Sequence, residues 1–325
     1  MGNTTAWDAR FEVTADGKGL VKDAGLVLLR KTADVVGLTE QIAVAFGPGR
    51  VERICRGTVL ASAAAAIAVG ARNLSQIERL LAGHDGTLGA CGSDTTLWRT
   101  LASVDDRRLA RLRTALRRTR KKAWQLIAGR PVGFPWLTIG GKTLPGWIVV
   151  DLDATLVECH SVKEQAAGTY KGGWGHHPLG GWVANTGETL TILPRPGNAG
   201  SNTAADHRIV LGEVFDQIPD PGVHSKILIR IDGAGASHET IERILTANHS
   251  RRRVAFTIGW TITPVEEAAI AALPEQSWTA YLRQNGEPAT VAGLDGEEMD
   301  YGHVAEITGL PGREGWPGDL RLIVR

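Results

Sequence analysis

Two apolar runs, each closed by an aspartate, limit what this chain can fold into more than any other feature. The run that begins at Trp147 leads to Asp153, and the run that begins at Ile227 leads to Asp232. Such runs are typical of strands that are covered on both faces. A carboxylate at the end of such a strand is costly to bury and gains nothing structural there. Two of them on one sheet therefore indicate a site where acids hold cations against a phosphate.

The charge of the chain is balanced overall but unevenly distributed. The 325 residues are 43% apolar, which suits a globular protein of two or three domains, and the formal net charge is +1. Residues 107–122 nevertheless carry nine Lys or Arg and no acid, whereas residues 264–300 carry eight acids and one Arg. The near-neutral total therefore conceals a basic face.

The cysteines and the hydropathy pattern predict a reducing, intracellular setting. The three cysteines lie far apart and form no CxxC pair, so neither a disulfide framework nor a zinc ribbon is indicated. The most apolar stretch, residues 58–70, is too short to span a bilayer, and the N-terminus lacks the layout of a signal peptide. We expect a cytosolic protein without a membrane partner.

The first part of the chain predicts a polar lead-in at residues 1–24 and a helical domain at residues 25–130. Helices are expected over 26–36, 51–69 and 74–81, and Ser93 or Asp94 is expected to cap the next one. The longest helix begins after Ser103 and has a narrow apolar stripe among basic residues. Its cations form either a solvated face on a packed helix or a surface that contacts phosphates. On the second interpretation, the DNA-contacting residues are Arg107, Arg108, Arg111, Arg117, Arg118, Arg120, Lys121 and Lys122.

The middle of the chain predicts an α/β fold with a mixed sheet. After a Pro- and Gly-rich linker at 131–146, residues 147–259 give the order strand, hairpin of two strands, helix, strand, helix, strand. The two helices are expected to be capped by Asn202 and Ser237. This is the layout of an RNase H-like core, and residues 260–325 look like part of a β-rich insertion that starts with a short acidic helix.

The predicted topology brings Asp153 and Asp232 together, although 79 residues separate them. Ligands of open α/β sheets bind at the carboxyl ends of the strands, and both aspartates lie at such ends. Arg195 and Asn198 flank the loop that enters the first core helix. They are plausible contacts to phosphate or DNA, with ordinary loop chemistry as the alternative.

Two other kinds of site have partial support. Asp151, Asp153 and Thr155 read Asp-x-Asp-x-Thr, which resembles the first motif of haloacid-dehalogenase-like phosphatases, with Asp151 as nucleophile and Asp153 as general acid. The strand of Asp232 continues without the second acid of that family, and a hairpin after Asp153 does not suit its parallel sheet. A zinc site would draw on four residues without ligand spacing, namely Cys159, His160, His176 and His177.

The ordered series of short motifs resembles the DDE transposases of bacterial insertion sequences, specifically transposase DDE domain group 1. The resembling segments are Val-Asp-Leu-Asp-Ala-Thr at 150–155, Gly-Thr-Tyr-Lys at 168–171, His-Pro-Leu at 177–179, Arg-Pro-Gly-Asn at 195–198 and Ile-Arg-Ile-Asp-Gly at 229–233. Residues 26–37 and 68–74 resemble the N-terminal region of the family, so the resemblance covers about residues 20–325.

The resemblance implies a transposase that hydrolyses phosphodiesters and transfers strands with two Mg²⁺ ions, for which Mn²⁺ substitutes. Its partners would be double-stranded DNA, as terminal inverted repeats and as target, and further copies of the chain on that DNA, in the bacterial cytosol. The first metal-binding and catalytic acid maps to Asp153, because Thr155 follows it, and the second maps to Asp232. Asp151 is then a neighbour of the site.

The third acid of the family has no counterpart in this sequence. Related transposases carry it on a helix that reads Tyr-x-x-Arg-x-x-x-Glu, yet Gln284 follows Tyr281 and Val304 follows Tyr301 at the Arg position. Glu306 lies on a strand-like run and is a poor substitute. The resulting hypothesis is a transposase truncated before its third acid, with little or no cleavage by this chain alone. The alternative is a catalytically dead DNA-binding remnant that regulates transposition.

Overall fold

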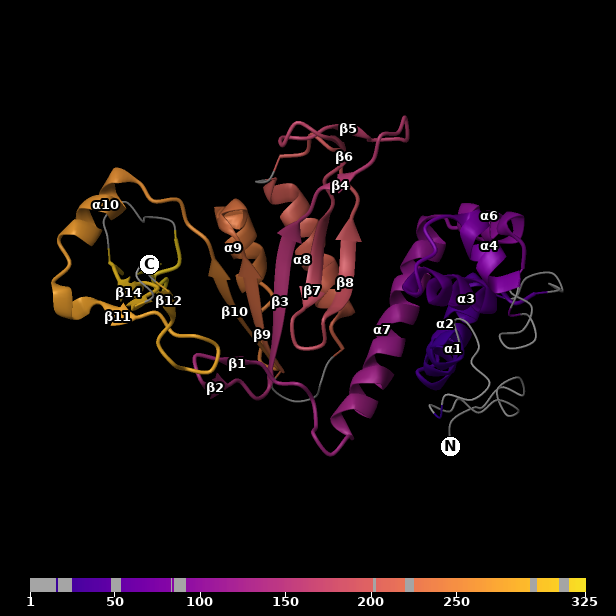
Figure 1. Cartoon of the computed structure of the whole chain (residues 1–325), viewed down its shortest axis with the longest axis horizontal. Coiled ribbons are helices and arrows are strands. Elements are labelled where there is room, and N and C mark those ends of the chain that lie inside the picture. Colours follow the sequence, from indigo (N-terminus) through magenta and orange to yellow (C-terminus); the bar gives the residue numbers. More distant parts are fainter. Residues whose placement is uncertain are drawn as a thin grey trace. The chain divides into compact units, whose positions relative to one another are not determined.

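The computed structural model describes residues 16, 25–47, 54–82, 84, 92–200, 203–219, 225–292, 297–309 and 316–325. The chain divides into two compact units, Met1–Phe134 and Pro135–Arg325 (Figure 1). No helix in these described ranges is both long and apolar enough to cross a membrane.

The first unit is helical. Its helices are α1 (Gly25–Val35), α2 (Leu38–Phe46), α3 (Arg56–Ala68), α4 (Leu74–Ala82), α6 (Asp94–Ala102) and α7 (Asp106–Ala128). Leu26, Val59, Leu81 and Leu97 are buried in one shared core. Ser93 caps α6 as predicted, since its side chain accepts a hydrogen bond from the backbone N–H of Thr96.

Two helix boundaries in this unit differ from the prediction. The helix expected over 26–36 ends at Val35, and α2, which was not predicted, begins directly after Gly37. Gly37 has φ 79°, a left-handed conformation that turns the chain rather than ending the helical region. The helix expected over 51–69 begins at Arg56, and residues 51–53 lie outside the described residues, as does nearly all of the lead-in.

The second unit is built on a five-stranded mixed sheet. Its strands are β3 (Trp147–Ala154), β7 (Leu179–Val183), β8 (Glu188–Leu193), β9 (Ser225–Ile231) and β10 (Arg252–Ile258), in the order β10-β9-β3-β7-β8. β3 pairs with β9 in parallel and with β7 antiparallel, while β9 and β10 are parallel and β7 and β8 are antiparallel. The predicted RNase H-like order is confirmed.

Two helices pack on this sheet. α8 (Ala204–Gln217) lies against β7 and β8, and α9 (His238–Leu245) lies against β10. A Cβ atom at Gly181 would meet the Val214 side chain at 2.6 Å, so the glycine lets α8 approach the sheet closely. Ser237 caps α9 as predicted, whereas the N-cap of α8 is Thr203 rather than Asn202, which lies outside the described residues.

The chain segment that connects β3 to β7 forms a small three-stranded sheet that was not predicted. It consists of β4 (Val157–Glu158), β5 (Ala167–Gly168) and β6 (Trp174–His176), in the order β4-β6-β5. Figure 1 shows this sheet beyond the carboxyl end of β3. We call residues 155–178 the lobe.

Short elements also occupy the ends of the second unit. Part of the predicted linker forms the hairpin β1 (Thr138–Ile139) and β2 (Lys142–Thr143). After β10 come α10 (Pro264–Ala271), β11 (Thr279–Ala280), β12 (Thr290–Ala292), β13 (Glu298–Asp300), β14 (His303–Glu306) and β15 (Ile323–Val324). They form the sheets β11-β14-β15 and β12-β13, which agrees with the β-rich segment expected there.

Candidate functional site

Asp153 and Asp232 lie level with each other at the carboxyl ends of β3 and β9. The parallel register pairs Asp151 with Arg230 and Leu152 with Ile231, so the next position on each strand is an aspartate. Adjacent strands lie about 4.8 Å apart, and both carboxylates are exposed. The structure therefore brings together the two acids that the sequence predicts to converge.

Both aspartates line one cavity of about 780 Å³. The sheet contributes the end of β3 and the residues after β9, and the lobe contributes Gly168, Thr169 and Tyr170. The loop after β8 contributes residues 197–200, which include the predicted contact Asn198. The lobe and this loop thus convert an open strand edge into a concave site, large enough for a nucleotide-sized ligand.

The donor atoms in the cavity suit a hard divalent cation. Asp153 uses Oδ1 to accept a hydrogen bond of 2.8 Å from the N–H of Ala154, and its other oxygen bonds to none of the described residues. Carboxylate oxygens are the ligands that Mg²⁺ prefers. The described residues contain no group of three or more His, Cys, Asp or Glu side chains placed to hold one metal ion. The site thus offers two carboxylates of the three that the family resemblance implies.

Asp151 is committed to an ion pair outside the cavity lining. Its two oxygens accept hydrogen bonds of 2.5 and 2.8 Å from Nε and Nη2 of Arg230, directly opposite on β9. This bidentate pair raises the pKa of Arg230 further above its ordinary value, chiefly through the hydrogen bond to Asp151. A carboxylate held this way is a poor nucleophile, which argues against the phosphatase alternative.

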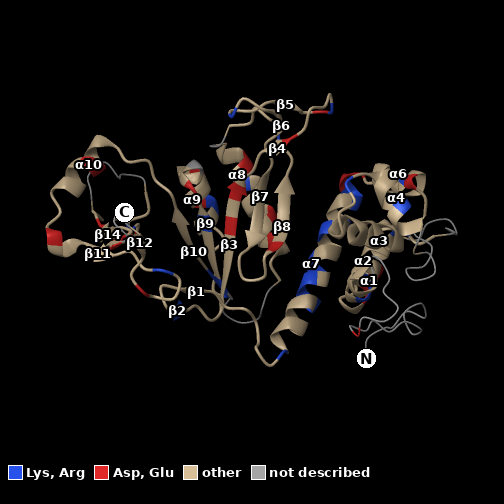
Figure 2. Cartoon of the chain, viewed as in Figure 1, with Lys and Arg blue, Asp and Glu red and all other residues tan. Residues whose placement is uncertain are grey.

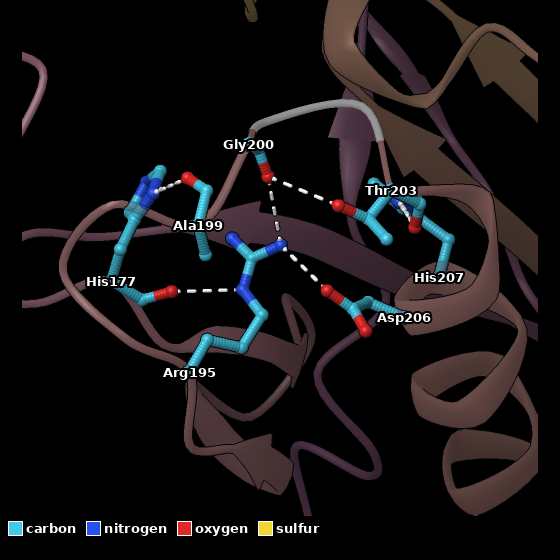
Figure 3. A network of polar contacts seen from close by, with 7 residues as sticks. All are labelled: His177, Arg195, Ala199, Gly200, Thr203, Asp206 and His207. Carbon is cyan, nitrogen blue, oxygen red and sulfur yellow. Dashed lines mark hydrogen bonds and ion pairs between the residues drawn. The ribbon is translucent and has the colours of Figure 1, made fainter. Parts of the chain in front are cut away.

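Arg195 holds the loop that forms one wall of the cavity (Figure 3). The side chain is 3% exposed, and its Nε donates to the carbonyl of His177 at 2.8 Å. Nη1 donates to the carbonyl of Gly200 and to Oδ2 of Asp206, at 3.1 and 3.2 Å. These bonds connect the lobe, the loop and α8. A direct contact between Arg195 and DNA stays a prediction.

Two buried histidines lie in the cavity wall, and neither is among the catalytic residues predicted from the sequence, although His177 was considered there as a zinc ligand. His177 and His207 are 3% and 2% exposed, and both line the cavity. Nδ1 of His177 lies 3.0 Å from the carbonyl of Ala199, and Nδ1 of His207 lies 3.2 Å from that of Thr203 (Figure 3). The His-Pro-Leu motif gave some indication of the first histidine, but no pattern marks the second.

Two of the four residues named for zinc, Cys159 and His176, make contacts inside the lobe. Nδ1 of His176 lies 3.5 Å from the Cys159 sulfur, and Nε2 of the same ring lies 3.1 Å from the carbonyl of Glu164. These contacts join the strands of the lobe to the segment between β4 and β5.

Helix α7 carries Lys and Arg residues along much of its length (Figure 2). Arg107, Arg111, Arg118 and Lys122 recur at intervals of four and seven residues, which aligns them on the helix, and all are exposed. With Lys121 we call this set the α7 basic face. Ala115, Thr119 and Trp124 are buried residues of the same helix.

The remaining cations predicted to contact DNA differ in exposure. Arg117 is exposed beside the α7 basic face. Arg108 is half-buried and donates to the carbonyl of Ser103, and Arg120 is 7% exposed. DNA contacts by these residues stay predictions, and burial makes Arg120 the weakest candidate.

Comparison with known proteins gives one family and two distant structures. The family model described as "Transposase DDE domain group 1" matches residues 4–325. No curated protein sequence matches the chain. A piggyBac transposase synaptic complex with hairpin DNA aligns with TM-score 0.28 and 10% identity, over 80% of this chain and 56% of that one. A Mos1 transposase paired-end complex with the left transposon end aligns with TM-score 0.24 and 11% identity, over 64% and 60%. The chain thus spans less than two thirds of either structure.

Proposed function

The chain belongs to the family of DDE transposases matched by this model, and from that premise we propose that it acts on double-stranded DNA as a transposase. The proposed reaction is phosphodiester hydrolysis followed by strand transfer. The proposed substrates are the terminal inverted repeats of a mobile element and its target DNA, bound by more than one copy of the chain in the bacterial cytosol.

The observation that carries the proposal is the pair of carboxylates at the ends of β3 and β9. Asp153 and Asp232 would hold Mg²⁺ or Mn²⁺, which when bound neutralises charge on the scissile phosphate and activates the attacking hydroxyl. The sheet holds the two carboxylates level, because the register on the preceding pair of residues is fixed. The lobe and residues 197–200 would enclose the phosphate, and the amide of Asn198, which lines the cavity, would donate a hydrogen bond to it.

The α7 basic face is the proposed surface for the DNA backbone. Cations at aligned positions on a helix neutralise successive phosphates, and this attraction does not depend on sequence. The acids of α7 are confined to its start, where Asp105 caps the helix and Asp106 lies in the first turn. The rest of the helix therefore offers phosphates a face of positive charge.

We propose that this chain alone cleaves DNA weakly. Glu306, the acid weighed as a substitute, pairs with Arg321 at 2.6 Å and does not line the cavity. The hydrogen bond from Arg321, and then that from Thr308, lowers the pKa of Glu306 to about 2. Two carboxylates hold one divalent cation less firmly than three, so the charge that develops on the phosphate is less well stabilised.

The test measures Mn²⁺ binding and plasmid nicking by the full chain, by D153N and D232N, and by the control E306Q. We expect either aspartate variant to weaken Mn²⁺ binding at least about tenfold, because a ligand is removed. E306Q should bind as the wild type does. Nicking of DNA that carries the element's ends should stay at trace level with Mg²⁺.

The other outcomes separate the alternatives. Robust Mg²⁺-dependent nicking that Asp153→Ala abolishes would overturn the proposal of weak cleavage. DNA binding that survives loss of both aspartates, without cleavage in Mn²⁺, would favour the regulatory DNA-binding remnant. Turnover of phosphomonoesters that depends on Asp151 would favour the phosphatase.

A further inference from the structure

His207 is a buried side chain in the wall of the carboxylate cavity that the proposed function leaves unused. It lies in the first turn of α8 and is 2% exposed. The cavity it lines also contains Asp153 and Asp232. A polar ring this deeply buried has a defined set of partners, and these partners fix which nitrogen carries the proton.

The hydrogen bond to the backbone fixes the tautomer of the ring. A carbonyl oxygen only accepts, so Nδ1 of His207 must donate to the carbonyl of Thr203 at 3.2 Å. Burial lowers the pKa of His207, and the nearby charge of Arg195 lowers it further, against the opposing effects of the Thr203 bond, Asp206 and Asp232. In the neutral ring the lone pair therefore lies on Nε2.

That lone pair has no partner in the part of the chain that the structure describes. Nδ1 accounts for the one hydrogen bond of the ring, and Nε2 makes none. An acceptor that borders a cavity can bond to water or to a ligand there. The cavity in front of the ring has room for water.

The ring is close enough to the carboxylates to sense them but not to share a metal ion with them directly. The charge of Asp232 acts on the pKa of His207. Yet the described side chains include no trio of acids, histidines or cysteines placed to ligate one ion, so Nε2 is not an inner ligand beside the two aspartates. A contact through one water molecule is the shortest indirect contact compatible with these observations.

We propose that His207 is a positioning residue of the cation site, whose Nε2 accepts a hydrogen bond from a water molecule bound to the cation at Asp153 and Asp232. The inference rests on the proposed function, because it places the cation there. His177 is not assigned the same role, because its ring packs against Tyr170 of the lobe, with the two ring centroids 5.6 Å apart.

Two substitutions separate this role from a purely structural one. His207→Asn keeps an N–H that can donate to the carbonyl of Thr203 but removes the acceptor at the Nε2 position. His207→Gln reaches further and restores an acceptor oxygen near that position. The matched control is His249→Asn, which makes the same change at an exposed histidine that does not line the cavity.

The first measurement is Mn²⁺ affinity, obtained from the electron paramagnetic resonance signal of free Mn²⁺ in solutions of the full chain. We expect H207N to bind Mn²⁺ about tenfold more weakly, the usual effect of removing a residue that orients a metal site from outside its ligand set. H207Q should recover most of the affinity, and H249N should match the wild type. Thermal unfolding of each variant establishes that the fold is kept.

The second measurement is the tautomer of His207, read from nitrogen chemical shifts of the full chain labelled with ¹⁵N-histidine. We expect proton on Nδ1 and none on Nε2 at neutral pH, with the Nε2 shift moving when diamagnetic Mg²⁺ is added. A proton on Nε2, or affinity in folded H207N equal to that of the wild type, would overturn the inference. A direct hyperfine coupling between Mn²⁺ and a ¹⁴N nucleus of the ring would show that His207 ligates the cation directly, which would also overturn the water-mediated contact.

The same titrations distinguish this inference from the proposed function. If Mn²⁺ binding requires both aspartates but its affinity is unchanged in H207N, only the role of His207 is overturned. If Mn²⁺ affinity is unchanged in D153N and D232N, the cation binds elsewhere, and both the role of His207 and the proposed cation site are overturned.

Discussion

Two aspartates of one strand illustrate how position decides what a residue does. Asp151 and Asp153 are two residues apart on β3, yet Asp151 has Arg230 opposite it and Asp153 has another acid. The first is neutralised by a bidentate ion pair. The second lies one residue beyond the last position paired with β9 and lines the cavity. The ion pair thus anchors the register two residues before the aspartates.

We predict that Asp151 and Arg230 are energetically coupled. Replacing Asp151 by Asn or Arg230 by Gln should each lower the free energy of unfolding by about 1 kcal/mol, since the side chains are more than a third exposed and water screens them. The double variant should lose less than the sum. A double-mutant cycle by urea unfolding measures the coupling, and strictly additive losses would contradict it.

We predict that His207 makes the second unit less stable in mild acid. Its folded pKa lies below the ordinary value of 6.5, so the unfolded chain binds more protons as pH falls through 6.5. The free energy of unfolding should therefore decline below that pH until the folded pKa is reached. Urea unfolding between about pH 7.5 and pH 5 should show this decline in the wild type and a smaller one in H207Q. Equal declines would refute the assignment.

The sequence predicts the two aspartates of the site but not its histidine. Asp153 and Asp232 are recognisable because a carboxylate after an apolar run is unusual wherever it occurs. His207 occupies an ordinary position in the first turn of a helix. Its role arises only because the fold brings the start of α8 to the carboxylate cavity, and no local pattern records that placement. Asp151 could be set aside as a bystander, but its partner Arg230 could be identified only from the strand register.

At the scale of elements, the core strands were predictable and the lobe was not. Apolar runs such as 148–152 and 227–231 belong to strands that are buried on both faces of the sheet. They can be recognised as strands without knowing what packs against them. The strands of the lobe are two or three residues long, too short for a periodic pattern. They are held by contacts with a distant loop. The bridge between His176 and Pro196 is one such contact.

We predict that Gly197 is required for the lobe to pack on that loop. A Cβ atom there would lie 2.3 Å from the carbonyl oxygens of both Ala167 and Gly175, and backbone atoms cannot rotate away. Gly197→Ala should therefore lower the free energy of unfolding by about 1–3 kcal/mol. Gly168→Ala is the matched control, because a Cβ atom there meets nothing within 4 Å. Urea unfolding compares the two, and equal stabilities would contradict the prediction.

At the scale of the whole molecule, the two proposed tasks fall in different units. The α7 basic face belongs to the first unit and the carboxylate cavity to the second. The sequence already shows this division in its charge, because nine cations gather at 107–122 while the strand aspartates lie further on. Binding of DNA and binding of cations can therefore be altered separately.

We predict that the α7 basic face sets the salt dependence of DNA binding. Replacing Arg111, Arg118 and Lys122 by Gln should reduce the slope of log affinity against log salt by about 0.9 for each phosphate that is no longer neutralised. Replacing three exposed cations of the second unit (Lys142, Arg208 and Arg251) is the control of equal charge. Fluorescence anisotropy with a DNA duplex at several salt concentrations measures the slope. Equal slopes for the two triple variants would show that the face is only solvated, and Mn²⁺ affinity should be unchanged in both.

The parallel pairing of β3 with β9 also determines when the cavity can exist during folding. Parallel strands need a long connection, and here it contains the lobe, the β7–β8 hairpin and α8. Contacts between residues this far apart in sequence form slowly, after the local ones. A growing polypeptide that has made Asp153 but not β9 therefore has only one carboxylate of the proposed cation site. If the cation binds there as proposed, its affinity becomes a reporter of the finished sheet, and the bound cation in turn favours the folded state over every earlier intermediate.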